Sequence, residues 1–406
     1  MLRISLISAL LAILSAPLAA QAGLPGVQVP RIGNVLGEVT DLANQSLDRA
    51  GQTARELARE RLRTIDRLVR RNRDTIALDT HGEPARKGEL LVLEADSDQI
   101  ASAREAGFSV METIEVAELG MSVTRLRVPA GVDTADAERR LGELLPSATI
   151  SADNLHFQAG SAGGVPLAVA AAGSKSHGAA VGMIDGAPGS SVHVTETRGF
   201  AQGAPYPSNH GSAVASLLAT QHAGTIRVAD VYGTDKAGGN ALAITRGLAW
   251  LVGAGSKVVT ISLVGPKNPV LERAIAAVRR RGVVVVAAVG NDGPAAPPAY
   301  PASYDGVVAV TAVDGKHRAL IEAGRALHLD YAAPGADIRG LNAKGKRMAL
   351  RGTSFATPLV AARLANAIGG GRNWRDALDG EAEDLGDKGI DLIYGRGLVC
   401  GSCKGR

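Results

Sequence analysis

Residues 352–368 read GTSFATPLVAARLANAI, and they indicate the fold more strongly than any other stretch of the chain. Gly352, Thr353 and Ser354 stand directly before an apolar run, as such residues do where a helix begins. Pro358 is tolerated there, because the amides of a first helical turn have no intrahelical partners. The stretch therefore predicts an apolar helix that ends near Ile368 and carries Ser354 at its N-terminus.

The rest of the sequence from residue 179 onward alternates short apolar strands with helices. Unbroken apolar runs predict strands over 180–184, 258–263, 282–288 and 307–313. Helical periodicity predicts helices over 212–220, 241–253 and 270–281. Such an alternation is typical of an α/β fold in which a parallel sheet is covered on both faces. Sites in sheets of this kind form at the carboxyl ends of the strands.

Two more polar residues fall where that rule places a site. Asp185 ends the first strand, and His210 begins a helix. Singly, each motif has an ordinary structural explanation, because a strand-end Asp caps a turn, a His-Gly pair lies in a loop and Gly-Thr-Ser caps a helix. Together they supply a carboxylate, a base and the nucleophile Ser354 at the element boundaries of one sheet, which is the set that nucleophilic catalysis needs.

In this chain order of Asp, His and Ser, the sequence resembles the subtilases, the subtilisin-like serine proteases. The resemblance extends over about residues 179–399 and is strongest at 352–358, which match the family's nucleophile motif Gly-Thr-Ser-x-Ala-[ST]-Pro. Residues 285–291 look like the family's oxyanion strand, and 330–335 look like its loop before the nucleophile. The resemblance implies a subtilisin-like fold and an endopeptidase that needs no cofactor. Whether a calcium ion binds is left open by the sequence, since no acidic loop in it has the spacing of calcium ligands.

The resemblance also implies the roles of the site residues. Ser354 attacks the scissile carbonyl, His210 moves the proton, and Asp185 orients the imidazole. The Asn291 side chain and the Ser354 amide stabilise the oxyanion. The residues implied to contact a polypeptide substrate form pocket walls, an edge strand and a pocket floor: Ser262, Leu263, Val264, Gly265, Ala288, Val289, Gly290, Lys236, Ala237, Gly238 and Ala299.

The chain departs from the family pattern close to two of these residues. Gly186 replaces the Ser or Thr that usually follows the Asp, so a hydroxyl that commonly supports the carboxylate is missing. Val264 replaces a Gly and narrows the pocket entrance. Neither departure removes a chemical group from the mechanism. Val264 and Ala299 together favour apolar or medium-sized side chains before the scissile bond.

The N-terminal part predicts export. In residues 1–22, Arg3, an apolar run and a small-residue end at Ala22 follow the order of a secretory signal peptide, and the run is too short to span a bilayer. The sequence does not distinguish a periplasmic from an extracellular protein. Residues 23–87 read as a linker and, over about 42–76, a basic amphipathic helix that rests on its neighbour rather than on a membrane.

Residues 88–157 read as two strand-helix-strand units, and the order βαββαβ predicts a ferredoxin-like domain. This domain resembles the subtilase propeptide, an intramolecular inhibitor or chaperone. The Gly- and Ala-rich residues 158–178 then form a linker before the catalytic domain at 179–406. We expect Ser354 to direct a cut between Phe157 and Gly178. The alternative is that the domain stays attached as a permanent part of the protein.

Composition limits the remaining function classes. The 406 residues are 46% hydrophobic and 21% charged, which excludes wholesale disorder. A net charge of +4 with 3% aromatic residues argues against nucleic acid as a partner. The two cysteines, Cys400 and Cys403, predict a local surface disulfide or two idle thiols. One other function remains open: a catalytically silent subtilase-like domain that binds a partner protein through its cleft.

Overall fold

The computed structural model describes residues 32–159, 161–163, 178–221 and 224–403, and of 32–50 and 161–163 it describes the backbone alone. The predicted signal peptide (1–22) lies outside these ranges, as does most of the predicted linker. Contacts divide the chain into two parts, 1–51 and 52–406, and the domains and sites considered below lie in the second part.

The described helices are α2 (Ile32–Arg71), α3 (Ser97–Glu105), α4 (Thr134–Leu144), α5 (Asn209–Gln221), α6 (Ala241–Gly253), α7 (Pro269–Arg280), α8 (Thr353–Gly369) and α9 (Trp374–Glu381). The described strands are β1 (Ile76–Leu78), β2 (Pro84–Leu93), β3 (Ser109–Val116), β4 (Met121–Arg127), β5 (Thr149–Asn154), β6 (Phe157–Gln158), β7 (Ser161–Gly163), β8 (Val181–Asp185), β9 (Glu196–Gly199), β10 (Ile226–Asp230), β11 (Val258–Ile261), β12 (Leu263–Val264), β13 (Val284–Ala288), β14 (Val308–Val313), β15 (Tyr331–Pro334), β16 (Ile338–Leu341) and β17 (Arg347–Arg351).

The smaller domain confirms the predicted ferredoxin-like order. The chain runs β2-α3-β3-β4-α4-β5, and the antiparallel strands lie in the order β5-β2-β4-β3, with β1 added as a hairpin partner of β2. Side chains alternate along β2, so Leu90 and Val92 pack under α3 and α4 while Leu91 packs toward the larger domain. The domain therefore has a core of its own and a second apolar face in contact with its neighbour.

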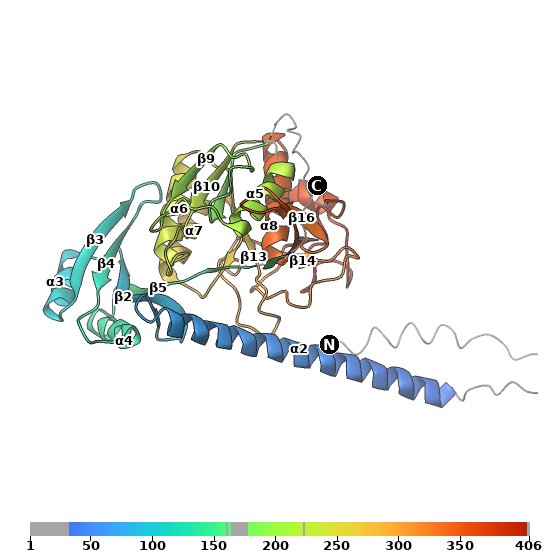
Figure 1. Cartoon of the computed structure of the whole chain (residues 1–406), viewed down its shortest axis with the longest axis horizontal. Helices are drawn as coiled ribbons and strands as arrows, with labels where there is room; N and C mark the ends of the chain where they lie inside the picture. The colour runs from blue at the N-terminus through green and yellow to red at the C-terminus, as the bar shows by residue number, and fades with distance from the viewer. Residues whose placement is uncertain (1–31, 160, 164–177, 222–223, 404–406) are drawn as a thin grey trace, which may run out of the picture. The chain divides into compact units, whose positions relative to one another are not determined.

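The larger domain contains a seven-stranded sheet in the order β15-β14-β13-β11-β8-β10-β9, and every pair in it is parallel. Helices α5 and α8 cover one face, and α6 and α7 cover the other (Figure 1). Strand β8 is the point at which the chain changes direction across the sheet, because β9 and β10 follow on one side and β11 on the other. A crevice at the carboxyl end of β8 is therefore the expected place for a site.

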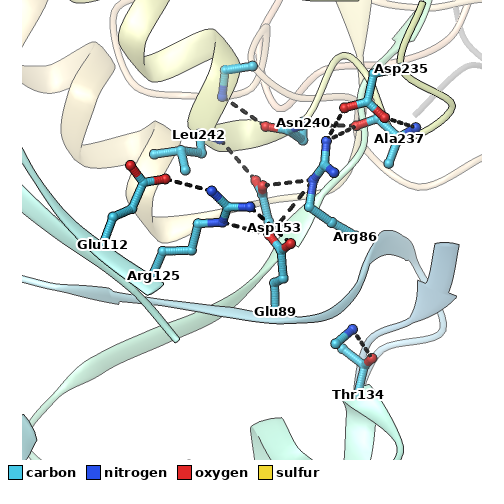
Figure 2. A network of polar contacts seen from close by, with 12 residues as sticks. Arg86, Glu89, Glu112, Arg125, Thr134, Asp153, Asp235, Ala237, Asn240 and Leu242 are labelled. Atoms are coloured by element: carbon cyan, nitrogen blue, oxygen red, sulfur yellow. Dashed lines mark hydrogen bonds and ion pairs between the residues drawn. The ribbon is translucent and has the colours of Figure 1, made fainter. Parts of the chain in front are cut away.

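A polar network joins the two domains (Figure 2). The Asp153 carboxylate on β5 is 1% exposed and accepts a hydrogen bond from the Leu242 amide at the start of α6, at 3.0 Å. Arg86 on β2 lies 3.9 Å from this carboxylate and also pairs with Asp235 of the larger domain. Burial raises the pKa of Asp153 to about 7, although the Leu242 amide and Arg86 oppose the shift.

Helix α2 and the cysteine pair differ in detail from what the sequence predicts. Helix α2 begins at Ile32 rather than near 42 and ends at Arg71 rather than 76, because Ile76 already pairs in β1. Cys400 and Cys403 form a disulfide, but both residues are buried rather than at the surface.

Among the described helices, none is long and apolar enough to cross a membrane. No group of three or more His, Cys, Asp or Glu within the described ranges is placed to hold a metal ion.

Candidate active site

Asp185 and His210 lie together at the crevice. Asp185 ends β8 with its side chain fully buried, and His210 lies in the first turn of α5. The His210 Nδ1 atom lies 3.0 and 2.9 Å from the two Asp185 carboxylate oxygens. The Gly186 amide donates to Asp185 Oδ1 at 2.7 Å. A buried carboxylate with such donors is suited to hold an imidazole in one orientation.

Ser354 lies at the N-terminus of α8, as the sequence predicts. Gly352 precedes the helix with φ of 138°, a backbone conformation that favours glycine, and no side chain caps the helix. The Ser354 amide is one of the first-turn donors without an intrahelical partner. It donates to the Ala159 carbonyl oxygen at 2.9 Å. An amide at the N-terminus of the helix, where partial positive charge accumulates, therefore binds another segment of the chain.

The Ser354 hydroxyl is buried beside this amide. Its Oγ donates to the Ser262 carbonyl oxygen at 2.9 Å, and the Ser262 hydroxyl donates back to the Ser354 carbonyl oxygen at 2.9 Å. His210 Nε2 is buried without a hydrogen-bond partner among the described residues. The ring of His210 packs at 5.4 Å from that of Phe355, the residue after Ser354. The Ser354 hydroxyl is therefore hydrogen-bonded to Ser262 and not to His210.

The segment that reaches Ser354 is extended and pairs with its neighbours on both sides. Phe157 and Gln158 form β6 and pair antiparallel with β12, and the Ala159 amide donates to Ser262 at 3.2 Å. On the other edge, the His156 amide donates to the Gly239 carbonyl oxygen at 2.8 Å. Beyond residue 160, β7 pairs antiparallel with β17. The chain is therefore held by backbone hydrogen bonds on both sides of the Ala159 carbonyl group.

Asn291 follows β13 and is tied to the start of α8. Its side-chain Oδ1 accepts a hydrogen bond from the Thr353 amide at 3.1 Å, and the Thr353 hydroxyl accepts one from the Gly290 amide at 3.1 Å. These bonds fix the amide group next to Ser354. They occupy the oxygen of Asn291 and leave its Nδ2 as the group able to donate to a ligand.

A cavity of about 1000 Å³ adjoins the Ala159 side chain. Val264, Gly290 and Ala299 meet on its wall, since a Cβ at Gly290 would lie 3.4 Å from Val264 and 3.8 Å from Ala299. Leu57 and Arg61 of helix α2 also line the cavity. The lining thus combines the apolar group at Val264, Gly290 and Ala299 with charged side chains such as Arg61.

The structure brings together most of the substrate-contacting residues that the sequence predicts. Ser262 bonds to Ala159 and Ser354, Leu263 and Val264 pair with β6, and Gly265 lies against His156. Ala288 and Val289 are buried at and just beyond the carboxyl end of β13. Of the predicted edge Lys236, Ala237 and Gly238, Ala237 packs with Leu155 of the extended segment. The backbone pairing of that segment falls on the next residues, Gly239 and Asn240. Sequence patterns gave no signal for Gly239, Gln158 or Ala159.

Comparison with known proteins assigns the chain to a family. The family model described as the subtilase family matches residues 149–397. Subtilisin DY of Bacillus licheniformis is 32% identical over 265 residues, which cover 58% of this chain and 95% of that protein. Subtilisin E of Bacillus subtilis is 30% identical over 272 residues, which cover 62% of this chain and 68% of that protein.

Solved structures agree with the fold. Fervidolysin from Fervidobacterium pennivorans superposes with a TM-score of 0.63 at 16% identity, covering 79% of this chain and 61% of fervidolysin. The epidermin leader peptide processing serine protease from Staphylococcus aureus gives a TM-score of 0.58 at 16% identity, covering 79% of this chain and 99% of that protein. The family match spans more than half of the sequence, and the chain is a member of the subtilase family, a subtilisin-like serine endopeptidase.

Proposed function

We propose that the chain is an exported endopeptidase that uses Ser354, His210 and Asp185 as a catalytic triad and first cuts its own linker between Ala159 and Gly160. The observation that carries the proposal is the hydrogen bond from the Ser354 amide to the Ala159 carbonyl oxygen. A peptide carbonyl group that already accepts a bond from the amide of the nucleophile is placed for attack.

In the mechanism that we propose, Ser354 Oγ leaves the Ser262 carbonyl oxygen and donates to His210 Nε2, which takes the proton as Oγ attacks the Ala159 carbonyl carbon. His210 Nδ1 donates to the buried Asp185 carboxylate, which stabilises the imidazolium that forms. The imidazolium then protonates the departing amine of Gly160, and water hydrolyses the acyl group from Ser354. Every proton that moves in this sequence passes through His210.

The negative charge that develops on the Ala159 oxygen needs more than one donor. The Ser354 amide is one, and we propose the Asn291 Nδ2 group as the second. Replacing Asn291 with leucine, which is similar in size, should slow self-cleavage by about 10² to 10³-fold, because one preorganised donor is lost. A time course of the intact and cut chains on a gel measures this rate. An unchanged half-time with an unchanged melting temperature would remove Asn291 from the mechanism.

We also propose that the part of the chain before the cut, which ends at Ala159 and is called the N-terminal module below, inhibits the enzyme after the cut. Its contacts with the larger domain do not depend on the cleaved bond. Helix α2 crosses the edge of the cavity so closely that a Cβ at Gly293 would lie 2.9 Å from Leu57. Arg61 pairs with Glu83 at 2.7 Å and with Asp292, next to the proposed oxyanion residue, at 3.4 Å. Removal of the module is therefore the step that opens the cleft to other polypeptides.

Two buried groups of the module should make its release depend on pH in opposite directions. Burial lowers the pKa of His156 to about 4, and burial raises that of Asp153 to about 7. Release exposes both to water. Between about pH 4 and 6.5, acidification protonates His156 only in the released module and so favours release. Over the same window, raising the pH ionises Asp153 only in the released module and also favours release.

These opposing effects should largely cancel in the wild type, so single variants should reveal them. In Asp153→Asn, docking of the cleaved module should weaken as the pH falls from 6.5 to 4. In His156→Phe, docking should weaken as the pH rises from 4 to 7. Each change should reach roughly 10²-fold or more, because one pKa unit corresponds to a factor of ten. Dissociation constants of the cleaved module across this range measure the effect, and two variants with the same flat profile would contradict it.

The cavity wall supports a preference for apolar or medium-sized residues at P1, the position of Ala159. Val264, Gly290 and Ala299 bring no charge to this wall. Cleavage-site profiling on a peptide library measures the preference, and a strict preference for acidic or basic P1 residues would contradict it.

A fluorophosphonate probe tests the enzymatic function against the silent, partner-binding alternative. Once self-cleavage is complete and the module has been released, the fragment that carries Ser354 should gain the mass of the phosphonyl group. The Ser354→Ala variant should take up no probe. A well-folded wild type that neither cuts itself nor reacts with the probe would favour the alternative.

A further inference from the structure

The buried carboxylate of Asp185 has a donor that the proposed mechanism does not require. Besides Gly186 and His210, the Gln158 side-chain Nε2 donates to Asp185 Oδ1 at 3.1 Å. Gln158 precedes Ala159, so it occupies the P2 position of the segment in the cleft, and its backbone pairs with Leu263. One of the hydrogen bonds to the proposed catalytic carboxylate thus comes from the residue to be cleaved away.

Gly186 explains why a substrate side chain fits beside the Asp185 carboxylate. A Cβ at this position would lie 2.5 Å from Ser208 Oγ and 3.8 Å from Gln158 Nε2. Residue 186 therefore contributes no hydroxyl to Asp185 and places no side-chain atoms between Gln158 and the carboxylate. Because Asp185 is fully buried, every donor that it lacks costs free energy in its ionised form.

We infer that the enzyme selects glutamine at P2, and that this side chain completes the hydrogen bonding of Asp185 and so helps to position His210. The inference rests on the proposed function, because it assigns a specificity to the same site. The primary amide of glutamine supplies an uncharged donor of the right length. A P2 methionine of similar length offers no donor, and a P2 glutamate places a second carboxylate beside Asp185.

The contact should act on turnover more than on binding, because the triad is positioned through it. Loss of a hydrogen bond to a charged group corresponds to a decrease of roughly 10- to 100-fold in kcat/KM. If the P2 pocket only held the side chain, loss of the glutamine would instead raise KM and leave kcat unchanged. The split between kcat and KM therefore separates positioning from simple fit.

The first experiment uses the full chain. Self-cleavage half-times are measured for wild type, Gln158→Met, Gln158→Glu and Gln158→Lys, with Gln202→Met as the matched control at an exposed glutamine. We expect Gln158→Met to be at least 10-fold slower, Gln158→Glu slower still, and Gln202→Met to match wild type. Equal rates for wild type and Gln158→Met would overturn the inference. A faster Gln158→Lys would also overturn it, because selection would then follow charge.

The second experiment gives the matured enzyme peptides that differ only at P2. Peptides with P2 glutamine should show the higher kcat, while KM stays within a few-fold of that for P2 methionine. Equal kcat with a raised KM would reject the positioning role. Self-cleavage by wild type with no P2 preference in either experiment would reject the P2 inference alone, whereas a wild type without any peptidase activity would reject the proposed function with it.

Discussion

Replacing Ser354 by alanine will lower the rate of self-cleavage by on the order of 10⁶-fold, which leaves the chain intact through any practical incubation. The loss follows from removing the nucleophile of a triad whose members act as a unit. The side chain is small and fully buried, and its hydroxyl donates only to the Ser262 carbonyl oxygen, so the fold should survive the change. Intact-mass time courses of wild type and variant give the two rates.

Ser190→Ala is the control for this change, because Ser190 lies exposed on the larger domain. It should cut itself at the wild-type rate. Cleavage by purified Ser354→Ala at more than a thousandth of the wild-type rate would mean that another residue is the nucleophile.

Replacing Asp185 by asparagine will slow self-cleavage by about 10⁴-fold, the second largest effect that we expect. The asparagine amide can donate to His210 Nδ1, which would leave the ring proton on Nε2. A nitrogen that carries a proton cannot accept the one from Ser354, so the nearly unchanged geometry would hold the wrong tautomer. The half-time of cleavage at neutral pH measures the loss.

The matched control for this second change is Asp305→Asn, because the Asp305 side chain is fully exposed. This control should cleave like wild type. A loss of less than ten-fold in Asp185→Asn would show that His210 does not depend on this carboxylate.

The three proposed triad residues could be predicted because each lies at an element boundary that the local sequence marks. A buried strand leads to Asp185, a helix begins beside His210, and Gly352 leads to Ser354 at the start of α8. These signals are short-range, and the parallel sheet brings them together by a general rule about strand ends. The order βαββαβ of the small domain along the chain could also be predicted, because the pattern that marks each strand and helix is local.

The resemblance implied that the end of the small domain enters the active site, but the sequence could not give its register there, because the register depends on pairing between distant parts of the chain. β6 pairs with β12 and β7 pairs with β17, across separations that no local pattern records. The sequence placed the cut anywhere between Phe157 and Gly178, whereas the register of β6 brings Ala159 to Ser354. The contact of Gln158 with Asp185 follows from the same register, so the sequence alone could not predict it either.

The position of the first cut tests the central claim most directly. Wild-type protein is expressed, and the intact masses of its fragments are measured together with those of Ser354→Ala. The account predicts a wild-type fragment that begins at Gly160, a cleavage half-time that does not change on dilution, and no such fragment in the variant. A fragment that begins elsewhere, or a wild-type chain that stays joined across Ala159 and Gly160, would contradict it.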